Sequence, residues 1–243
     1  MNSRRSLFFM CCALFGAFTG CSSPPQIPEK GESVILVHGL GRSSSSMKVL
    51  ASRVEEAGYR VINFGYPSTS EPIEALTERL GAEVERSCGA DRSGVHFVTH
   101  SMGGVLVRSY LSSQEEPHEG RVVMLSPPNQ GSEIIDAFED SSLLRELLGP
   151  AGMKLGTGEE GIAQELGPVR FTLGVITGDR SLSPLGSWLI PGPDDGKVAV
   201  DRAAVEGAVD FKVIHATHTF IMNRKDVAEE VLHFLEHGQF IQS

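Results

Sequence analysis

The sequence predicts an α/β fold, with a mostly parallel, doubly wound sheet and helices on both faces. Short apolar runs such as residues 33–37 and 121–125 are rich in β-branched residues, as expected of strands buried on both faces. Amphipathic segments of helical length, such as residues 72–88, separate these runs, and this alternation is typical of βαβ units. At 243 residues, the chain has the length of one such domain.

The predicted elements follow one another in a regular order. Strands are expected at residues 33–37, 60–64, 95–99, 121–125, 171–177 and 211–214. Helices are expected at residues 47–58, 72–88, 104–112 and 226–237. Between residues 126 and 168 the alternation breaks, and apolar residues there predict short helices over the sheet edge. This insertion forms a lid or a substrate-binding wall, or it only packs against the sheet.

The first 20 residues differ from the rest and are interpreted as a lipoprotein-type signal peptide. Arg4 and Arg5 precede an apolar run, residues 7–18. At about 1.5 Å per residue, this run is too short to cross a hydrocarbon core of about 30 Å. Thr19-Gly20-Cys21 resembles a bacterial lipobox, so Cys21 is the expected lipidation site. An ordinary cleaved signal or a short N-terminal anchor is the alternative.

These features predict an exported protein of the bacterial cell envelope, lipid-anchored on the periplasmic side. Residues 21–32 form a flexible tether to the folded domain, residues 33–243. The formal net charge of −10 argues against nucleic-acid partners, which need a basic face, and against electrostatic binding to membranes. Membrane contact is therefore assigned to the lipid anchor. Cys88 is the single cysteine of the folded domain, which excludes an internal disulfide. The sequence does not indicate the oligomeric state.

A candidate nucleophile lies in the segment VTHSMGGV, residues 98–105, between a predicted strand and a predicted helix. A nucleophile elbow, G-x-S-x-G, holds a serine in such a turn with its hydroxyl exposed at the helix N-terminus. Here Thr99 occupies the first glycine position, whereas Gly103 keeps the second. Threonine is small enough for the turn, although its branched Cβ adds crowding. Ser101 is therefore the predicted nucleophile, and a helix-capping serine is the alternative.

A nucleophilic serine needs a base to take its proton and donors for the oxyanion. His218 lies in the loop between the last predicted strand and the last helix, the usual place for the base in this chain order. His215, nearer the strand end, is expected to pack or cap. The backbone N–H groups of Leu40 and Met102 are the predicted oxyanion donors. His38 is expected to shape the loop before Leu40.

Two carboxylates compete for the role of the acid that orients the base. Asp179 ends a predicted strand, and catalytic groups of parallel sheets gather at that edge. Asp195 lies in a turn-rich loop, where an exposed turn residue is the ordinary role of an aspartate. The residues alone leave this choice open.

With these motifs, the chain resembles the α/β-hydrolase superfamily, and more narrowly its small bacterial lipases and esterases, including PGAP1-like hydrolases. The resemblance covers residues 33–238 and rests on four motifs: VHGLG at 37–41, THSMGG at 99–104, DGKV at 195–198 and THTF at 217–220. In that superfamily the acid often opens an Asp-x-x-Val segment ahead of the last strand, which implies Asp195.

The implied function is a serine hydrolase that cleaves carboxylic esters, lipid esters among them, through an acyl-enzyme intermediate. The expected substrate is a small-molecule or lipid ester, and neither a cofactor nor a metal is expected. The alternative is a non-catalytic envelope lipoprotein that uses a hydrolase-like fold for binding. The presence of Ser101, His218 and two candidate acids favours the enzyme.

Overall fold

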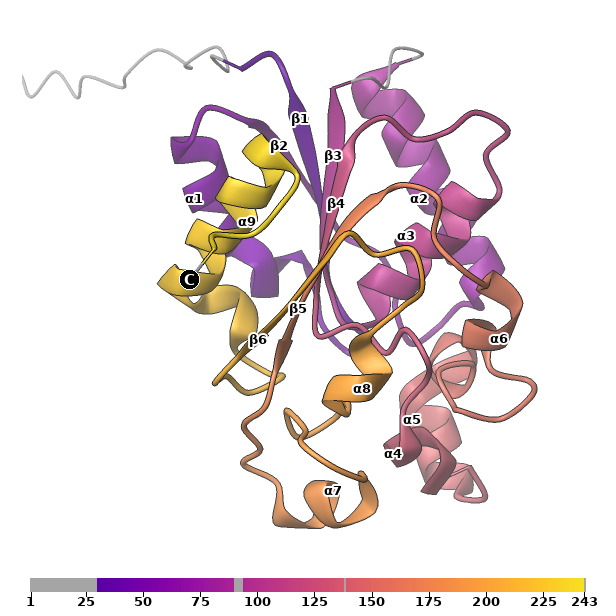
Figure 1. Ribbon diagram of the computed structural model, residues 1–243. Helices are drawn as coiled ribbons and strands as arrows, with labels where there is room; N and C mark the ends of the chain where they lie inside the picture. Colours follow the sequence, from indigo (N-terminus) through magenta and orange to yellow (C-terminus); the bar gives the residue numbers. More distant parts are fainter. Residues whose placement is uncertain (1–29, 90–93, 138, 243) are drawn as a thin grey trace, which may run out of the picture.

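The computed structural model contains one parallel sheet (Figure 1), and it describes residues 30–89, 94–137 and 139–242. The sheet order is β2-β1-β3-β4-β5-β6, and each pair of neighbours is parallel. The strands are β1 (Ser33–Val37), β2 (Arg60–Phe64), β3 (Val95–His100), β4 (Arg121–Leu125), β5 (Thr172–Gly178) and β6 (Asp210–Ile214). The predicted α/β sheet is thus confirmed.

Four helices cover the two faces of the sheet. They are α1 (Lys48–Glu56), α2 (Ile73–Cys88), α3 (Met102–Ser112) and α9 (Lys225–His237). In Figure 1, α1 and α9 lie on one face, and α2 and α3 lie on the other. Alternate residues of β1 enter two separate cores: Ile35 and Val37 pack on the α2 and α3 side, Val34 and Leu36 on the α1 and α9 side. Burial on both faces explains why this strand is apolar throughout.

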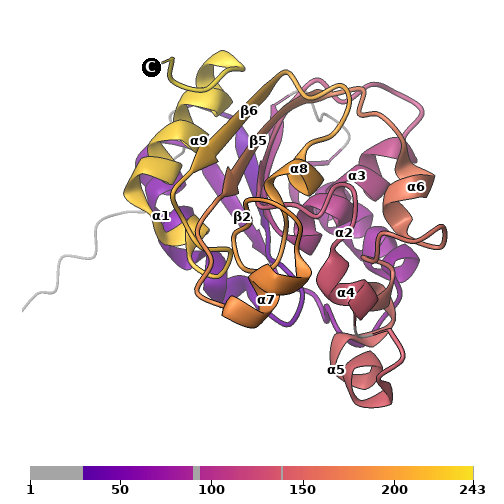
Figure 2. The same cartoon turned by 60° about the horizontal axis from the view of Figure 1, so that its bottom comes forward.

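Further helices follow β4 and β5, and several of them lie at the carboxyl end of the strands. The insertion between β4 and β5 contains α4 (Glu133–Ala137), α5 (Ser142–Met153) and α6 (Ile162–Leu166). After β5 come α7 (Pro184–Leu189) and α8 (Val200–Ala203). Two 3₁₀ helices among the described residues are η1 (Ser44–Met47), before α1, and η2 (Ile221–Asn223), before α9. Figure 1 shows α4, α5 and α7 at the bottom of the view, and Figure 2 brings this end forward. The sequence does not predict α7 or α8.

A buried arginine on α3 ties the insertion to the domain. Arg108 donates hydrogen bonds to the main-chain and side-chain oxygens of Asn129, at 2.9 and 3.1 Å, and to the carbonyl of Gly167, at 2.7 Å. Burial lowers the pKa of Arg108 to about 10. Asn129 in turn donates to the carbonyl of Ala203. Both ends of the insertion are therefore fixed, and Asn129, near its start, has a structural role.

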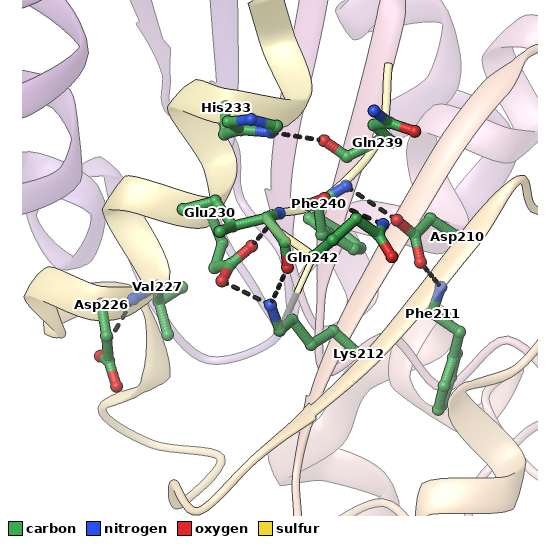
Figure 3. Close-up of polar contacts among 11 residues, drawn as sticks. Asp210, Phe211, Lys212, Asp226, Val227, Glu230, His233, Gln239, Phe240 and Gln242 are labelled. Carbon is green, nitrogen blue, oxygen red and sulfur yellow. Dashed lines mark hydrogen bonds and ion pairs between the residues drawn. The ribbon is translucent and has the colours of Figure 1, made fainter. Parts of the chain in front are cut away.

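The edge strand β6 is fastened to the C-terminal segment (Figure 3). Lys212 forms an ion pair with Glu230 of α9 at 2.6 Å. The N–H of Phe240 donates to Asp210, and the N–H of Ile241 donates to Glu230. These bonds hold the strand that directly precedes the loop of His218.

The predicted signal peptide, residues 1–20, and Cys21 lie outside the described residues, as does most of the tether. Within the described residues, every helix is too short or too polar to cross a bilayer.

Candidate active site

Ser101 occupies a strained turn between β3 and α3. Its backbone has φ 54° and ψ −127°, a region that non-glycine residues seldom adopt and that such nucleophile turns require. The Ser101 N–H donates to the carbonyl of Leu125 at 2.9 Å. A Cβ on Gly103 would lie 2.5 Å from the carbonyl oxygen of Val37, so only glycine permits this approach of α3 to the end of β1. Helix α3 begins at Met102, directly after Ser101, and therefore two residues earlier than the sequence predicts.

Thr99, at the first glycine position of the elbow, is accommodated by a glycine on the next helix. Its side chain is buried, and a Cβ on Gly104 would lie 3.2 Å from Thr99 Oγ1. The absence of a side chain at Gly104 therefore leaves room for Thr99, and also for Met124 and Pro127.

His218 lies within hydrogen-bond distance of both Ser101 and Asp195. Its Nε2 is 3.0 Å from Ser101 Oγ, and its Nδ1 is 2.8 Å from Asp195 Oδ2. An ionised carboxylate only accepts hydrogen bonds, so Nδ1–H donates to Asp195 and Nε2 is free to accept from the serine hydroxyl. This arrangement can move a proton from Ser101 to the imidazole and stabilise the resulting imidazolium.

Asp195 is held in place by the loop that carries it. The residue is 2% exposed, and its carboxylate Oδ1 accepts hydrogen bonds from the N–H groups of Lys197 and Val198, at 3.0 and 2.9 Å. The His218 N–H also donates to the Asp195 carbonyl at 2.9 Å. Burial alone would raise the pKa of Asp195, but the interaction with His218 and the hydrogen bond from the Val198 N–H help to outweigh it, so the pKa lies below its ordinary value.

Asp179, the other candidate acid, lies apart from this group. Its carboxylate pairs with Nδ1 of His215 at 2.9 Å, and both side chains are more than a third exposed. The structure therefore brings Ser101, His218 and Asp195 together and leaves Asp179 with a different histidine.

The loop after β1 approaches Ser101 closely. A Cβ on Gly39 would lie 2.9 Å from Ser101 Cβ, so the main chain that leads into Leu40 passes close to the serine. Met102 begins the first turn of α3, where N–H groups have no partner within the helix. The predicted oxyanion donors are therefore on two backbones that meet at Ser101.

Two further histidines support this centre. His38 donates from Nδ1 to the carbonyl of Gly39 and stacks on Tyr66, with ring centroids 4.2 Å apart, so it shapes the loop as expected. His100 donates from Nε2 to the carbonyl of His218 at 2.9 Å. Burial lowers the pKa of both histidines, which keeps them neutral. Sequence reasoning missed the role of His100, because its partner lies 118 positions further along the chain.

The Ser101 hydroxyl faces a cleft of about 860 Å³. The insertion and the segment around α7 supply much of its apolar lining: Ile134, Ile135, Leu147, Leu148, Leu155, Leu182 and Leu189. Phe220 lines the cleft as well and, like Leu147 and Leu182, is more than half exposed. The insertion therefore forms a wall of the cleft, consistent with one of the roles expected for it.

Solved structures with similar folds include a lipase, a carboxyl esterase and a phospholipase. The lipase BlEst2 of Bacillus licheniformis, in its mature form, has a TM-score of 0.66 and 19% identity, over 90% of this chain and 96% of the lipase. The metagenomic carboxyl esterase MGS0156 has a TM-score of 0.65 and 20% identity, over 84% of this chain and 69% of the esterase. Phospholipase PlaB of Legionella pneumophila has a TM-score of 0.65 and 15% identity, over 86% of this chain.

This chain covers 60% of the length of that phospholipase, and at these identities the likeness shows a shared fold. No curated protein sequence matches the chain significantly. The model of one family matches residues 34–230, which include Ser101, Asp195 and His218. The chain therefore belongs to the alpha/beta hydrolase family.

Proposed function

We propose that this protein is a serine hydrolase that cleaves carboxylic esters through an acyl-enzyme intermediate on Ser101. The observation that carries this proposal is the hydrogen-bonded chain from Ser101 through His218 to the buried Asp195. Membership of the alpha/beta hydrolase family and the lipase and esterase folds among the similar structures agree with it.

The reaction follows from this geometry in two halves. Ser101 Oγ attacks the ester carbonyl while His218 Nε2 accepts the hydroxyl proton, and the N–H groups of Leu40 and Met102 bind the oxyanion. The intermediate collapses to an acyl-serine ester, and His218 gives its proton to the departing alcohol. Water then attacks the acyl-serine with His218 as base, which releases the acid and restores Ser101. Asp195 orients His218 and stabilises its charged form throughout.

The cleft supports an ester with an apolar acyl group, such as a lipid ester. Its lining from the insertion and the α7 segment is largely aliphatic. Burying an acyl chain there gains about 0.8 kcal/mol for each methylene removed from water. The exposed side chains of Leu147, Leu182 and Phe220 extend this apolar surface to the mouth of the cleft.

The sequence also supports a location for this activity. We infer from the apolar segment and the Thr19-Gly20-Cys21 motif that the protein is exported and lipid-anchored at Cys21 in the cell envelope. Metabolic labelling with a palmitate analogue should mark the wild-type protein, and Cys21→Ala should abolish the label and release the protein from membranes. A label that persists in Cys21→Ala would refute the anchor.

The hydrolase proposal is tested with p-nitrophenyl esters of increasing acyl length. The wild-type protein should release p-nitrophenol, with kcat/KM rising from acetate to medium-chain esters. Ser101→Ala should lower kcat by about 10⁴ or more. Ser112→Ala, an exposed serine at the end of the same helix, is the matched control and should retain turnover. Equal turnover in Ser101→Ala and wild type would exclude the proposed nucleophile.

A further inference from the structure

The cleft beside Ser101 carries positive charge in a protein whose formal net charge is −10. Arg42, from the loop after β1, and Lys197, from the loop of the candidate acid, both line it. Among the described residues that line the cleft, Asp195 contributes the single carboxylate, and that carboxylate is already paired with His218. The cleft therefore differs in charge from the protein as a whole.

Neither Arg42 nor Lys197 forms an ion pair with a carboxylate of the described residues. Elsewhere on the surface, by contrast, Arg79 pairs with Glu71 and Lys212 with Glu230. Partial burial and the nearby Arg42 guanidinium lower the pKa of Lys197, against a smaller opposing effect of Asp195. Two mutually repelling cations at one cleft are stabilised by an anion that binds between them.

Both cations are carried by well-fixed main chain. The Lys197 N–H donates to Asp195 Oδ1 at 3.0 Å, and its carbonyl accepts a hydrogen bond from the Ser132 hydroxyl at 2.8 Å. The Arg42 N–H donates to the carbonyl of Gly39. The neighbouring Gly41 N–H donates to the Ser68 hydroxyl at 3.0 Å. Because these loops also carry the candidate acid and a predicted oxyanion donor, the main chain that carries both cations has a fixed position relative to Ser101.

We propose that Arg42 and Lys197 form an anion subsite that binds a carboxylate or phosphate group of the ester substrate. The aliphatic wall of the cleft takes the apolar part of the same molecule. The substrate class is thus an anionic amphiphilic ester. This inference rests on the proposed esterase function. It specifies which class of esters the site prefers.

The test compares soluble ester pairs that differ in one charge. In the first pair, the anion is on the acyl side: the mono-p-nitrophenyl ester of adipic acid against p-nitrophenyl hexanoate. In the second pair it is on the alcohol side: 3-carboxyphenyl butyrate against 3-carbamoylphenyl butyrate. The wild-type protein should prefer the anionic ester in at least one pair, as judged by kcat/KM, and high salt should weaken this preference by screening.

Variants assign that preference to the two cations. Arg42→Gln and Lys197→Gln should each reduce the ratio of anionic to neutral kcat/KM by about tenfold, the worth of a hydrogen bond to a charged group. Lys197→Arg keeps the charge and should keep most of the ratio. Lys48→Gln, an exposed lysine on α1 away from the cleft, is the control and should not change it.

The possible results are distinct. Hydrolysis of both members of each pair with equal kcat/KM, or a preference that survives both Gln variants, would overturn the anion subsite while leaving the esterase intact. Failure of wild type to hydrolyse any of the four esters, with no acyl-serine formed, would overturn the proposed function itself.

Discussion

The Nε2–H of His100 donates a hydrogen bond to the main-chain carbonyl of His218 at 2.9 Å. His100 is the last residue of β3 and directly precedes Ser101, while His218 lies in the loop between β6 and α9. The two imidazole rings lie 4.9 Å apart between centroids. This contact therefore joins the strand of the candidate nucleophile to the loop of the candidate base, and it makes His100 a positioning residue.

Loss of this bond should slow the chemical step without weakening substrate binding. His100→Phe removes the donor but keeps a ring of similar size, so kcat should fall by about tenfold while KM stays near its wild-type value. His100→Gln, which can donate from its amide, should recover part of the loss. Steady-state kinetics with p-nitrophenyl butyrate checks this. A rise in KM alone, or no change in kcat, would contradict the positioning role.

The stability of the protein should fall as the pH drops below about 6.5, the ordinary pKa of histidine. Burial lowers the pKa of His38, His96 and His100 in the folded protein. Between the folded and unfolded pKa values the unfolded chain binds more protons, so the free energy of unfolding rises with pH there. Each histidine contributes up to about 1.4 kcal/mol per pH unit. Asp195, whose pKa is lowered, adds a loss only at more acidic pH.

Urea unfolding at a series of pH values between neutral and mildly acidic measures this slope. His100→Phe should show a shallower slope than wild type, because it removes one of the three groups. If the slope in His100→Phe equals that of wild type, protonation of His100 does not contribute to the loss of stability at low pH.

The two candidate acids should respond very differently to amide substitution. Asp195→Asn leaves the shape intact but favours the wrong imidazole tautomer, so kcat should fall by about 10⁴. Asp179→Asn alters only the exposed contact with His215, and turnover should stay near the wild-type value. Parallel kcat measurements on both variants decide between them. The reverse pattern would assign the acid to Asp179.

Thr99→Val should stabilise the protein. The buried Thr99 Oγ1 has no hydrogen-bond partner within the described part of the chain, so a methyl of the same size avoids an uncompensated desolvation cost. The gain should be about 1 kcal/mol, or about 2–4 °C in Tm. Thr77→Val is the matched control, because Thr77 Oγ1 donates to the carbonyl of Ile73 at 2.8 Å, and it should lower Tm. A lower Tm in Thr99→Val would show that this hydroxyl is satisfied.

Much of the fold could be predicted from the sequence because its strands are short, apolar and separated by amphipathic helices. Val34 to Val37 are buried on alternate sides of the sheet, and a continuous apolar run is the pattern that results. α7 and α8 could not be predicted, since helices of six and four residues show no periodicity. Their position depends on contacts such as the hydrogen bond from Ser187 to Asp194.

The candidate site was predictable to a different degree at each residue. Ser101 and His218 follow the ends of strands, where parallel sheets collect functional groups. That same rule favours Asp179, yet the loop after β5 folds back and carries Asp195 to His218 instead. The residues alone leave this choice open, and family resemblance implies Asp195. No local signal predicts His100, whose role depends on a contact across the sheet.

The role of Ser101 as nucleophile is tested by mass-spectrometric mapping of the protein after reaction with a fluorophosphonate. We expect a single covalent adduct on Ser101, which is absent from Ser101→Ala and forms much more slowly in His218→Ala. A folded wild-type protein that remains unmodified at Ser101, or that carries its adduct on another serine, would contradict this role.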